Sequence, residues 1–540
     1  MIILTYDVGT TGVKTCLFSI EDEGGRQGPP LYILDSCFAE YSLRILPNGG
    51  AEQDPEEWWT ALCQTTRQLA DRWPEECSLI AGISFCAQAQ SLVLLDKAAR
   101  PVRPSMSYMD QRSGTVRRAH SGRGPKIAGA GIPFLLQSLY HTGVVAGSDK
   151  DPVWKYIWVK ENEPEVYARI YKWLDVKDAL IAKMTGRFTM SRDSAFASMI
   201  MDKNLEPPQF SSVLMKRLRI LKRHMPEIVN STDKVGSLLP EPAAELDLRP
   251  GIPVFSGGSD SSLIGVGAGC VRQGMTHVYM GTSGWVSAVT EKNTVDTSAM
   301  IASVVGVQPG LYNYFAELET AGKCLEWVRD HLALDEINIY LEKLDVSEDP
   351  SSEYESLYDY LSKVISETEE GSGGVIFTPW LHGNRCPFED ANARGIFFNI
   401  SLETGKTELI RSVVEGICYH MRWFLETIRK KIKTADSVRF VGGGALSGVT
   451  AGILANVLQL PVETVPEPQN VGAVGAALVA AVGLGRIRDL TAAEDLIQPC
   501  RVYQPDPQTR AIHDRNYAAF TKLYVTNKNL FRHLNQDDGL

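Results

Sequence analysis

Short apolar runs alternate with longer amphipathic stretches along the chain, which is the pattern of an α/β protein. The runs at residues 2–6, 79–85 and 252–255 predict buried strands, and a further strand is expected at 92–96. A helix is expected from Pro55 to about residue 73, because Asp54 can cap it and Pro55 suits the first helical position. Strands and helices that alternate in this way favour sheets covered by helices.

The second half of the chain continues the pattern. Strands are expected at 276–280, 376–381 and 438–441, and helices at 409–431, 470–484 and 510–532. Residues 153–183 look largely helical, with Trp154, Trp158 and Leu174 on apolar faces. The segment 248–253, LRPGIP, combines two prolines with a glycine and is the best domain boundary. We therefore predict two lobes, residues 1–250 and 251–540.

One stretch at the start of the second lobe joins an acid to a glycine loop. The strand at 252–255 runs into glycines and then Asp260, and the strand at 276–280 opens into GTSG at 281–284. Glycines let backbone N–H groups approach a ligand closely, so such a loop can hold phosphate. An acid at a neighbouring strand end can act as a base. The structural alternatives are a helix cap at Asp260 and a hairpin turn at 281–284.

The same arrangement occurs near the N-terminus. The strand at 2–6 opens into residues 7–14, DVGTTGVK, which again contain an acid, Asp7, and a Gly-Thr loop before another strand at 15–19. Two such loops, roughly 270 residues apart, suggest a nucleotide held between two related lobes.

Composition narrows the class of protein. The 540 residues carry a net charge of −11, with a pI near 5.5, which disfavours nonspecific nucleic-acid binding. Ten cysteines without a C-x-x-C pair indicate reduced thiols in a cytoplasmic protein. The start, MIILTYDVG, lacks the features of a signal peptide. The longest apolar run, 471–484, is too short and too rich in Gly and Ala for a membrane span.

Several polar positions are candidates for ligand binding. Gln88 and Gln90 lie where the chain leaves a strand, and amide groups suit neutral hydroxylated ligands, although ordinary loop hydrogen bonds are the alternative. Asp110 and Arg112 follow a short apolar and aromatic segment, and an exposed charge pair is the structural alternative. Gly322 would allow an anion to approach a helix N-terminus. The glycine loop at 442–447, GGGALS, could flank an adenosine. The acidic segment 335–370 is interpreted as a solvated helical insertion.

Taken together, several sequence motifs resemble those of a known protein family. DVGTTGVK, EQDPEEWW, VFSGGSDSSLIGVGAG, MGTSG, AGKCLEW, VGGGALS and NVGAVGAALVA stand in this order over most of the chain. In them the chain resembles the FGGY family of carbohydrate kinases and is most similar to xylulokinases. The resemblance implies two ribonuclease-H-like lobes, as in actin and hexokinase, with ATP and Mg²⁺ in the cleft between them. The resemblance is also compatible with a homodimer.

The resemblance implies roles for individual residues. Asp260 matches the catalytic base, and Asp7 matches the acid near the phosphates and the metal. Positions on the phosphate or nucleotide side are matched by Thr10, Thr11, Lys14, Gly281, Thr282 and Gly322, and the adenosine loop by Gly443 and Gly444. The sugar side departs from the family: xylulokinases usually carry Gln-Met-His at 88–90 and Trp-Asn-Asp at 108–110, where this chain has Gln-Ala-Gln and Tyr-Met-Asp.

The sequence therefore predicts phosphoryl transfer from ATP to a sugar hydroxyl, with Asp260 as general base and a ketopentose or a related sugar or polyol as acceptor. Gln88, Gln90, Asp110 and Arg112 would bind the sugar. A non-metabolic ATPase switch of the same fold is the alternative. A dinucleotide oxidoreductase is a weaker one, since Gly265, Gly267 and Gly269 do not form a G-x-G-x-x-G motif followed by a ribose-binding acid.

Overall fold

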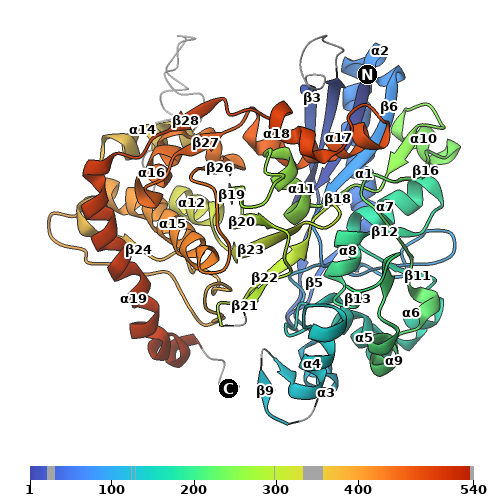
Figure 1. The fold of residues 1–540 in the computed structure, drawn as a ribbon, viewed down its shortest axis with the longest axis horizontal. Coiled ribbons are helices and arrows are strands. Elements are labelled where there is room, and N and C mark those ends of the chain that lie inside the picture. The colour runs from blue at the N-terminus through green and yellow to red at the C-terminus, as the bar shows by residue number, and fades with distance from the viewer. Residues whose placement is uncertain (21–30, 123, 128, 297, 333–356, 536–540) are drawn as a thin grey trace.

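The protein is built on two mixed β-sheets with helices packed between and around them (Figure 1). The computed structural model describes residues 1–540 except 21–30, 123, 128, 297, 333–356 and 536–540. The expected loop at 21–30 and most of the acidic insertion therefore lie outside the described residues.

The first sheet has β1 at its centre. In spatial order its main strands are β16 (Lys234–Ser237), β17 (Pro253–Phe255), β6 (Ile80–Ala87), β1 (Ile2–Val8), β2 (Gly12–Ile20) and β3 (Leu31–Glu40), and the short β18 (Gly258–Ser259) pairs with β6. β1, β2 and β3 form an antiparallel meander, whereas β6 runs parallel to β1 and β17 parallel to β6. The expected strands at 2–6, 15–19 and 79–85 are confirmed, each somewhat longer than predicted.

The second sheet repeats this plan. Its order is β21 (Val295–Asp296), β22 (Ile301–Val305), β23 (Tyr312–Leu318), β20 (Gly284–Thr290), β19 (Thr276–Met280), β26 (Val438–Val441), β27 (Val462–Thr464) and β28 (Arg501–Tyr503). β19, β20 and β23 form the antiparallel meander, and β26 and β27 add in parallel. In both sheets an antiparallel strand, β16 or β28, closes the parallel side. The repeat of strand directions confirms the two related lobes that the sequence indicated.

The first sheet includes strands on both sides of the predicted lobe boundary. The strand at 252–255 was expected to open the second lobe, but β17 and β18 pair with β6 and belong to the first sheet. The first sheet therefore extends through Ser259, past the predicted boundary at 250. The Pro-Gly turn before β17 leads into a sheet strand rather than into a linker, because the parallel edge of β6 offers unpaired backbone groups there.

Two glycine-rich helices, α11 (Asp260–Gly267) and α17 (Val471–Gly483), lie between the sheets (Figure 1). A buried apolar cluster joins them to both sheets, with Ile3 and Phe18 from the first and Trp285 from the second. Their backbones nearly touch: a Cβ on Gly267 would lie 1.9 Å from the carbonyl oxygen of Val471, and one on Gly475 would lie 2.4 Å from that of Leu263. Glycine is required for this approach.

Helices and small sheets complete both lobes. The remaining helices are α1 (Pro55–Arg72), α2 (Pro74–Ser78), α3 (Gly114–His120), α4 (Ile132–His141), α5 (Pro152–Asn162), α6 (Pro164–Arg169), α7 (Val176–Thr185), α8 (Arg192–Ala197), α9 (Ser212–Leu218), α10 (Pro240–Leu246), α12 (Gly322–His331), α14 (Leu357–Glu367), α15 (Lys406–Arg429), α16 (Gly448–Leu458), α18 (Ala493–Leu496) and α19 (Arg510–Asn535). The small sheets pair β4 (Arg44–Ile45), β5 (Ala51–Gln53) and β8 (Ser105–Met106); β7 (Val93–Leu95) with β11 (Lys172–Leu174); β9 (Lys126–Ile127) with β10 (Ala130–Gly131); β12 (Thr189–Ser191) with β15 (Glu227–Val229); β13 (Met201–Asp202) with β14 (Gln209–Phe210); and β24 (Ile376–Phe377) with β25 (Phe397–Phe398).

Most predicted helices are confirmed, and local signals explain the exceptions. The helix from Pro55 ends one residue before the predicted end, and the Asp54 carboxylate accepts the Glu56 N–H at 3.0 Å. The stretch 153–183 is not continuously helical, because a new helix starts at Pro164 and β11 follows as a strand paired with β7. The strand expected at 376–381 ends at Phe377, shortly before Pro379.

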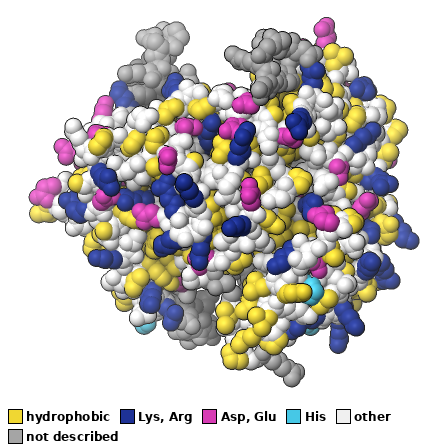
Figure 2. Space-filling view, viewed as in Figure 1, with side chains coloured by type: hydrophobic (Ala, Val, Ile, Leu, Met, Phe, Trp, Pro, Cys, Tyr) yellow, Lys and Arg dark blue, Asp and Glu magenta, His cyan; other side chains and the backbone are white. Residues whose placement is uncertain are grey.

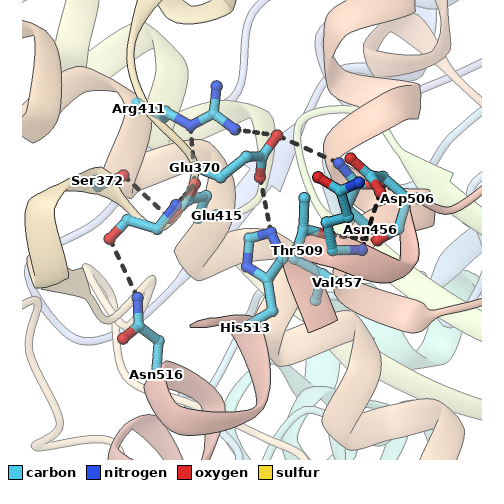
Figure 3. Close-up of polar contacts among 12 residues, drawn as sticks. Glu370, Ser372, Arg411, Glu415, Asn456, Val457, Asp506, Thr509, His513 and Asn516 are labelled. Atoms are coloured by element: carbon cyan, nitrogen blue, oxygen red, sulfur yellow. Dashed lines mark hydrogen bonds and ion pairs between the residues drawn. The ribbon is translucent and has the colours of Figure 1, made fainter. Parts of the chain in front are cut away.

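A buried ionic network fastens the C-terminal helix to the second lobe. The Arg411 guanidinium on α15 pairs with Glu415 at 2.8 Å and with Glu370 at 2.7 Å, and Glu370 also contacts the His513 ring of α19 at 2.7 Å (Figure 3). Figure 3 shows these side chains pointing toward one another. The Glu415 carboxylate also accepts the Gly371 N–H and the Ser372 hydroxyl. Because the guanidinium already pairs with both carboxylates, we assign these residues a structural role.

Acidic and basic side chains are interspersed over the face shown in Figure 2, and apolar side chains gather over α4. Leu136 and Tyr140 of α4 are 62% and 71% exposed. Nine of the ten cysteines are buried and Cys500 is exposed, all as free thiols. Within the described part of the chain, none of the helices combines the length and apolar character needed to cross a membrane.

The glycine contact between α11 and α17 predicts a stability effect. Gly267→Ala should lower the melting temperature by roughly 2–10 °C, because overpacking a close contact costs about 1–3 kcal/mol. The matched control is Gly452→Ala in α16, where an added Cβ meets no atom within 4 Å. This control should melt at the wild-type temperature or slightly above it, since Ala is the better helix former. Equal melting temperatures for the two variants would contradict the close contact.

Candidate active site

Three neighbouring parallel strands end at the same edge of the first sheet. In register, Asp7 of β1 lies beside Cys86 of β6, and Cys86 lies beside Gly258 of β18. Gln88 follows β6 directly, and Asp260 follows β18. Ligands in α/β sheets bind outside the carboxyl ends of parallel strands, so this edge brings two carboxylates and an amide to one candidate site.

Asp260 begins α11, and one of its carboxylate oxygens accepts the Ser261 N–H at 2.7 Å. Burial raises the pKa of this carboxyl from 3.8 to about 7, and the nearby carboxylates of Asp7 and Glu317 raise it further, while the Ser261 N–H opposes the shift. A carboxyl whose pKa lies near neutrality can both take and release a proton at physiological pH, which suits a general base. Asp260 can therefore occupy the start of the helix and still have the pKa expected of a general base.

Asp7 lies against the first turn of α17. A Cβ on Gly472 would lie 2.7 Å from a carboxylate oxygen of Asp7 and 2.9 Å from the Cys86 sulfur, so glycine permits the helix to start there. Burial raises the pKa of the Asp7 carboxyl, and the Lys14 ammonium opposes that rise. The Lys14 Nζ itself donates to the Gln469 carbonyl oxygen at 2.8 Å, just before α17. Lys14 thus links the first Gly-Thr loop to the second half of the chain.

The first Gly-Thr loop is a tight hairpin between β1 and β2. Gly9 N–H donates to the Gly12 carbonyl at 2.9 Å, and the Tyr41 hydroxyl donates to the Gly9 carbonyl at 2.6 Å. Thr11 is exposed at the tip, and the Thr10 hydroxyl donates to the Tyr108 hydroxyl at 3.3 Å.

The second loop has the equivalent position between β19 and β20. Gly281 N–H donates to the Ser283 carbonyl at 2.9 Å, and Thr282 is exposed at the tip. The hairpin alternative is thus confirmed for residues 281–284, and it does not conflict with phosphate binding. Gly322 has a different use from the expected one: its N–H donates to the Gly281 carbonyl at 2.8 Å, and Lys323 N–H to that of Thr282 at 3.2 Å. The first turn of α12 therefore supports the hairpin.

The glycine loop after β26 packs beside this second hairpin. A Cβ on Gly444 would lie 2.7 Å from the Met280 sulfur, at the end of β19. Gly442 N–H donates to the Pro468 carbonyl at 2.8 Å. Gly443 is exposed, and an added Cβ there would meet no atom within 4 Å. The predicted adenosine loop thus has an open side next to the second predicted phosphate loop.

Gln88 is the best-placed candidate for contact with a hydroxylated ligand. It is buried, and its amide nitrogen donates to the Gln53 side-chain oxygen at 2.9 Å, while the Gln53 nitrogen donates to the Thr10 carbonyl at 2.7 Å. The Gln88 side-chain oxygen is buried and has no hydrogen-bond partner among the described residues. Sequence reasoning did not assign Gln53, although it lies in the EQDPEEWW motif.

Asp110 and Arg112 form a buried pair. The guanidinium contacts the carboxylate with 2.7 and 2.9 Å bonds, and the carboxylate also accepts the Ala51 N–H at 2.9 Å. Arg112 pairs with Glu52 as well, at 2.9 Å. The alternative of an exposed charge pair is wrong, because both side chains are buried.

Charged residues from the second lobe also lie near the site, and sequence reasoning did not find them. Burial raises the pKa of the Tyr108 hydroxyl to about 12, with contributions from Glu317, Asp260 and Glu319. Arg385 pairs with Glu317, and Lys150 of the first lobe pairs with Glu319 of the second, both at 2.8 Å. No sequence motif marks these residues, because only the packing of the lobes brings them together.

Comparison with known proteins places the chain in a family. A model of the FGGY family of carbohydrate kinases matches its N-terminal domain to residues 2–267 and its C-terminal domain to residues 277–484. The chain belongs to the FGGY family of carbohydrate kinases. Its class of reaction is the ATP-dependent phosphorylation of a sugar hydroxyl, and the acceptor sugar and ATP are its substrates.

Individual relatives agree with this assignment. The chain is 27% identical to a xylulose kinase of Lactococcus lactis, over 97% of this chain and 96% of that protein. It is 25% identical to a gluconokinase of Bacillus subtilis, over 92% and 90%. Among solved structures, a xylulose kinase from Lactobacillus acidophilus superposes with a TM-score of 0.82 at 24% identity and 99% coverage of both chains. Plasmodium falciparum glycerol kinase with ADP gives 0.77 at 17% identity, covering 96% of this chain and 97% of that one. The two-lobed actin- and hexokinase-like fold is thus confirmed.

The raised pKa of Asp260 predicts a pH-dependent stability difference. The carboxyl titrates at 3.8 ordinarily and at about 7 in the fold, so the folded protein binds the extra proton between these values. Stability from this group is therefore lost as pH rises through that window. Asp260→Asn should melt at a higher temperature than the wild type, by a margin that grows from about pH 4 to pH 7 and then levels off.

Thermal melts at closely spaced pH values measure this margin. Asp71→Asn, at an exposed position, is the control and should show a smaller change with pH. A margin that is constant for Asp260→Asn, or that shrinks toward pH 7, would contradict the raised pKa of Asp260.

Proposed function

We propose that the protein transfers the γ-phosphoryl group of ATP to a hydroxyl of a neutral sugar, a ketopentose such as xylulose or a related sugar or polyol, with Asp260 as general base. The observation that carries this proposal is the juxtaposition at one sheet edge of Asp260, whose carboxyl has a pKa of about 7, and Gln88, whose buried oxygen lacks a partner among the described residues. The names of the relatives, xylulose kinase above all, support the acceptor class.

Asp260 takes the proton of the acceptor hydroxyl as that oxygen attacks the γ-phosphorus in line. A bond forms between the sugar oxygen and phosphorus, the bond to the bridging oxygen breaks, and ADP leaves with that electron pair. The Asp260 side chain is short, and its carboxylate accepts the Ser261 N–H at the start of α11. The carboxylate is therefore held in place.

The two hairpins support the phosphate chain in this proposal. Thr10 and Thr11 in one lobe, and Thr282 in the other, offer N–H and hydroxyl groups at strand ends, where charge develops during transfer. Gly281 supports the second hairpin through its bond to the Ser283 carbonyl. Lys14 adds positive charge beside the first hairpin. Gly443 and Gly444 would flank the adenosine, and Gly322 acts through its hydrogen bond to the second hairpin.

The residues around Asp7 fit a magnesium ion. Mg²⁺ prefers oxygen ligands and is usually held by one or two carboxylates together with substrate phosphates and water. Asp7 supplies a carboxylate, which is near enough to raise the pKa of the Asp260 carboxyl electrostatically. When bound, the ion would neutralise charge on the phosphates.

On the sugar side, Gln88 would accept a hydrogen bond from a hydroxyl, and Gln90 would add an amide where xylulokinases usually have histidine. The Gln90 side chain is partly exposed and makes no hydrogen bond with the rest of the described chain. Asp110 and Arg112 would act mainly by shaping the wall, since each already has protein partners.

An ATPase switch of the same fold is the competing function, and it predicts ATP consumption that sugars do not change. A coupled assay of ADP formation across pentuloses, hexuloses, polyols and aldonates separates the two. The oxidoreductase alternative loses its basis, because Gly267 serves the packing of α11 against α17.

We also propose that the protein works in the cytoplasm. All ten cysteines are free thiols, including the exposed Cys500. Thiols persist in reduced form in that compartment.

Asp260→Asn should lower kcat by about 10²–10⁴-fold, which is the usual contribution of a general base. ADP and ATP should still bind, as isothermal calorimetry would show, because the hairpins are unchanged. In the wild type, kcat/KM should fall as pH drops below about 7, where the carboxyl becomes protonated. Glu403→Gln, at an exposed position, is the control. Near-normal turnover of Asp260→Asn would reject the assignment.

Gln88→Leu should raise the KM for the sugar by about 10–100-fold, because a site built to bond a hydroxyl loses that bond and gains an apolar surface. The KM for ATP should stay within about twofold. Gln508→Leu, on the exposed surface, serves as the matched control. An unchanged sugar KM would show that the free Gln88 oxygen does not face the substrate.

A further inference from the structure

A buried lysine lies behind the sugar side of the site. Lys155 is on α5, is 0% exposed, and has no role in the mechanism above. Its Nζ donates to the carbonyl oxygen of Gln90 at 2.9 Å and to that of Ser107 at 2.7 Å. One ammonium group thus holds two loops that are distant in sequence: the loop after β6, with Gln88 and Gln90, and the loop after β8, with Tyr108 and Asp110.

The first of these loops has a conformation that needs support. Gln90 has a φ of 65°, in the left-handed region that non-glycine residues rarely adopt. Its N–H donates to an Asp175 carboxylate oxygen at 3.0 Å, and the other oxygen accepts the Ser91 N–H at 3.1 Å. Lys155 holds the carbonyl side of the same residue. Gln90 is therefore fixed from both sides, and the direction of its side chain is set by these two anchors.

The second loop is held at its start. The Ser107 carbonyl accepts from Lys155 and also from the Asp110 N–H at 3.0 Å. Leu92 and Met106 bond each other's backbone at 2.9 and 3.1 Å, so the two loops leave a common point side by side. Lys155 closes the gap between them just beyond that point.

The amine can keep both bonds whether or not it is charged. Burial lowers the pKa of Lys155 to about 7, and the carboxylates of Asp110, Asp151 and Asp175 oppose the shift. A neutral amine still has two N–H donors, one for each carbonyl. The bonds therefore do not depend on a full charge.

We propose that Lys155 is a positioning residue that sets the spacing of the two sugar-side loops and so determines the affinity for the acceptor sugar. This inference rests on the proposed function. It extends that function by assigning an effect on sugar affinity to a residue that touches neither substrate. The effect acts through the spacing between Gln88 and Gln90 on one loop and Tyr108 on the other.

The test compares Lys155→Met with Lys160→Met, using D-xylulose, or, where the wild type does not phosphorylate it, the sugar or polyol that the wild type turns over fastest. Lys160 is on the same helix and also donates to a backbone carbonyl, that of Arg219 at 2.9 Å, but at an exposed position. Lys155→Met should raise the sugar KM by about tenfold or more, with the ATP KM within about twofold and a smaller change in kcat. Lys160→Met should match the wild type.

A purely structural lysine would change both substrate constants together or neither of them, and either outcome overturns the proposal. If Lys155→Met does not fold, Lys155→Gln replaces it. Its shorter amide keeps a donor but reaches at most one carbonyl, so the same split between sugar and ATP constants is expected. Failure of the wild type to phosphorylate any sugar would instead refute the proposed function, which separates the two failures.

Hydrogen exchange gives a readout independent of turnover. In Lys155→Met, amides in peptides covering 88–92 and 107–110 should exchange faster than in the wild type. The hairpin at 281–284 should be unchanged. Unaltered exchange in both sugar-side loops would show that Lys155 does not hold them.

Discussion

The backbone contact between α11 and α17 is the constraint on which the site depends. Gly267 and Gly475 let these two helices approach until an added Cβ would collide with a carbonyl group. α11 begins with Asp260, and the second residue of α17, Gly472, lies against Asp7. The separation of the two carboxylates is therefore fixed by helix packing, and both helices are anchored in the apolar cluster between the sheets.

The repeated sheets explain how one site can use both lobes. Each sheet ends its central hairpin with a Gly-Thr turn, and each places parallel strands beside that turn. The first sheet adds acids and amides at the strand ends, whereas the second adds the open Gly443 loop. The two sheets thus present different chemical groups at corresponding ends. The Lys150–Glu319 pair and the bond from the Asn313 side chain to the Ser261 carbonyl join the lobes around this site.

Much of this could be predicted from sequence, because the signals were local. Strand 276–280, the Asp54-capped helix and the glycine turns carry their own propensities, and they were found within a residue or two. The pairing of β17 with β6 was not found, because its partners lie about 170 residues apart and no local signal records it. The helix predicted across 153–183 failed for a related reason, since β11 exists through its pairing with β7.

The site was predicted unevenly for the same reason. Asp7 lies near the end of β1, and Gln88 and Asp260 follow β6 and β18, so their convergence follows from topology. Gln53, Glu317 and Lys155 reach the site from elements whose placement needs the whole fold. Asp110 and Arg112 were expected to face the ligand, but the adjacent Ala51 N–H and Glu52 engage them.

A crystal structure with the acceptor sugar and a non-hydrolysable ATP analogue tests the account most directly. It should show an Asp260 carboxylate oxygen about 2.6–3.2 Å from one sugar hydroxyl, with the terminal phosphate between the turns at 9–12 and 281–284. A sugar bound away from Asp260, or phosphates held by only one of the two turns, would contradict it.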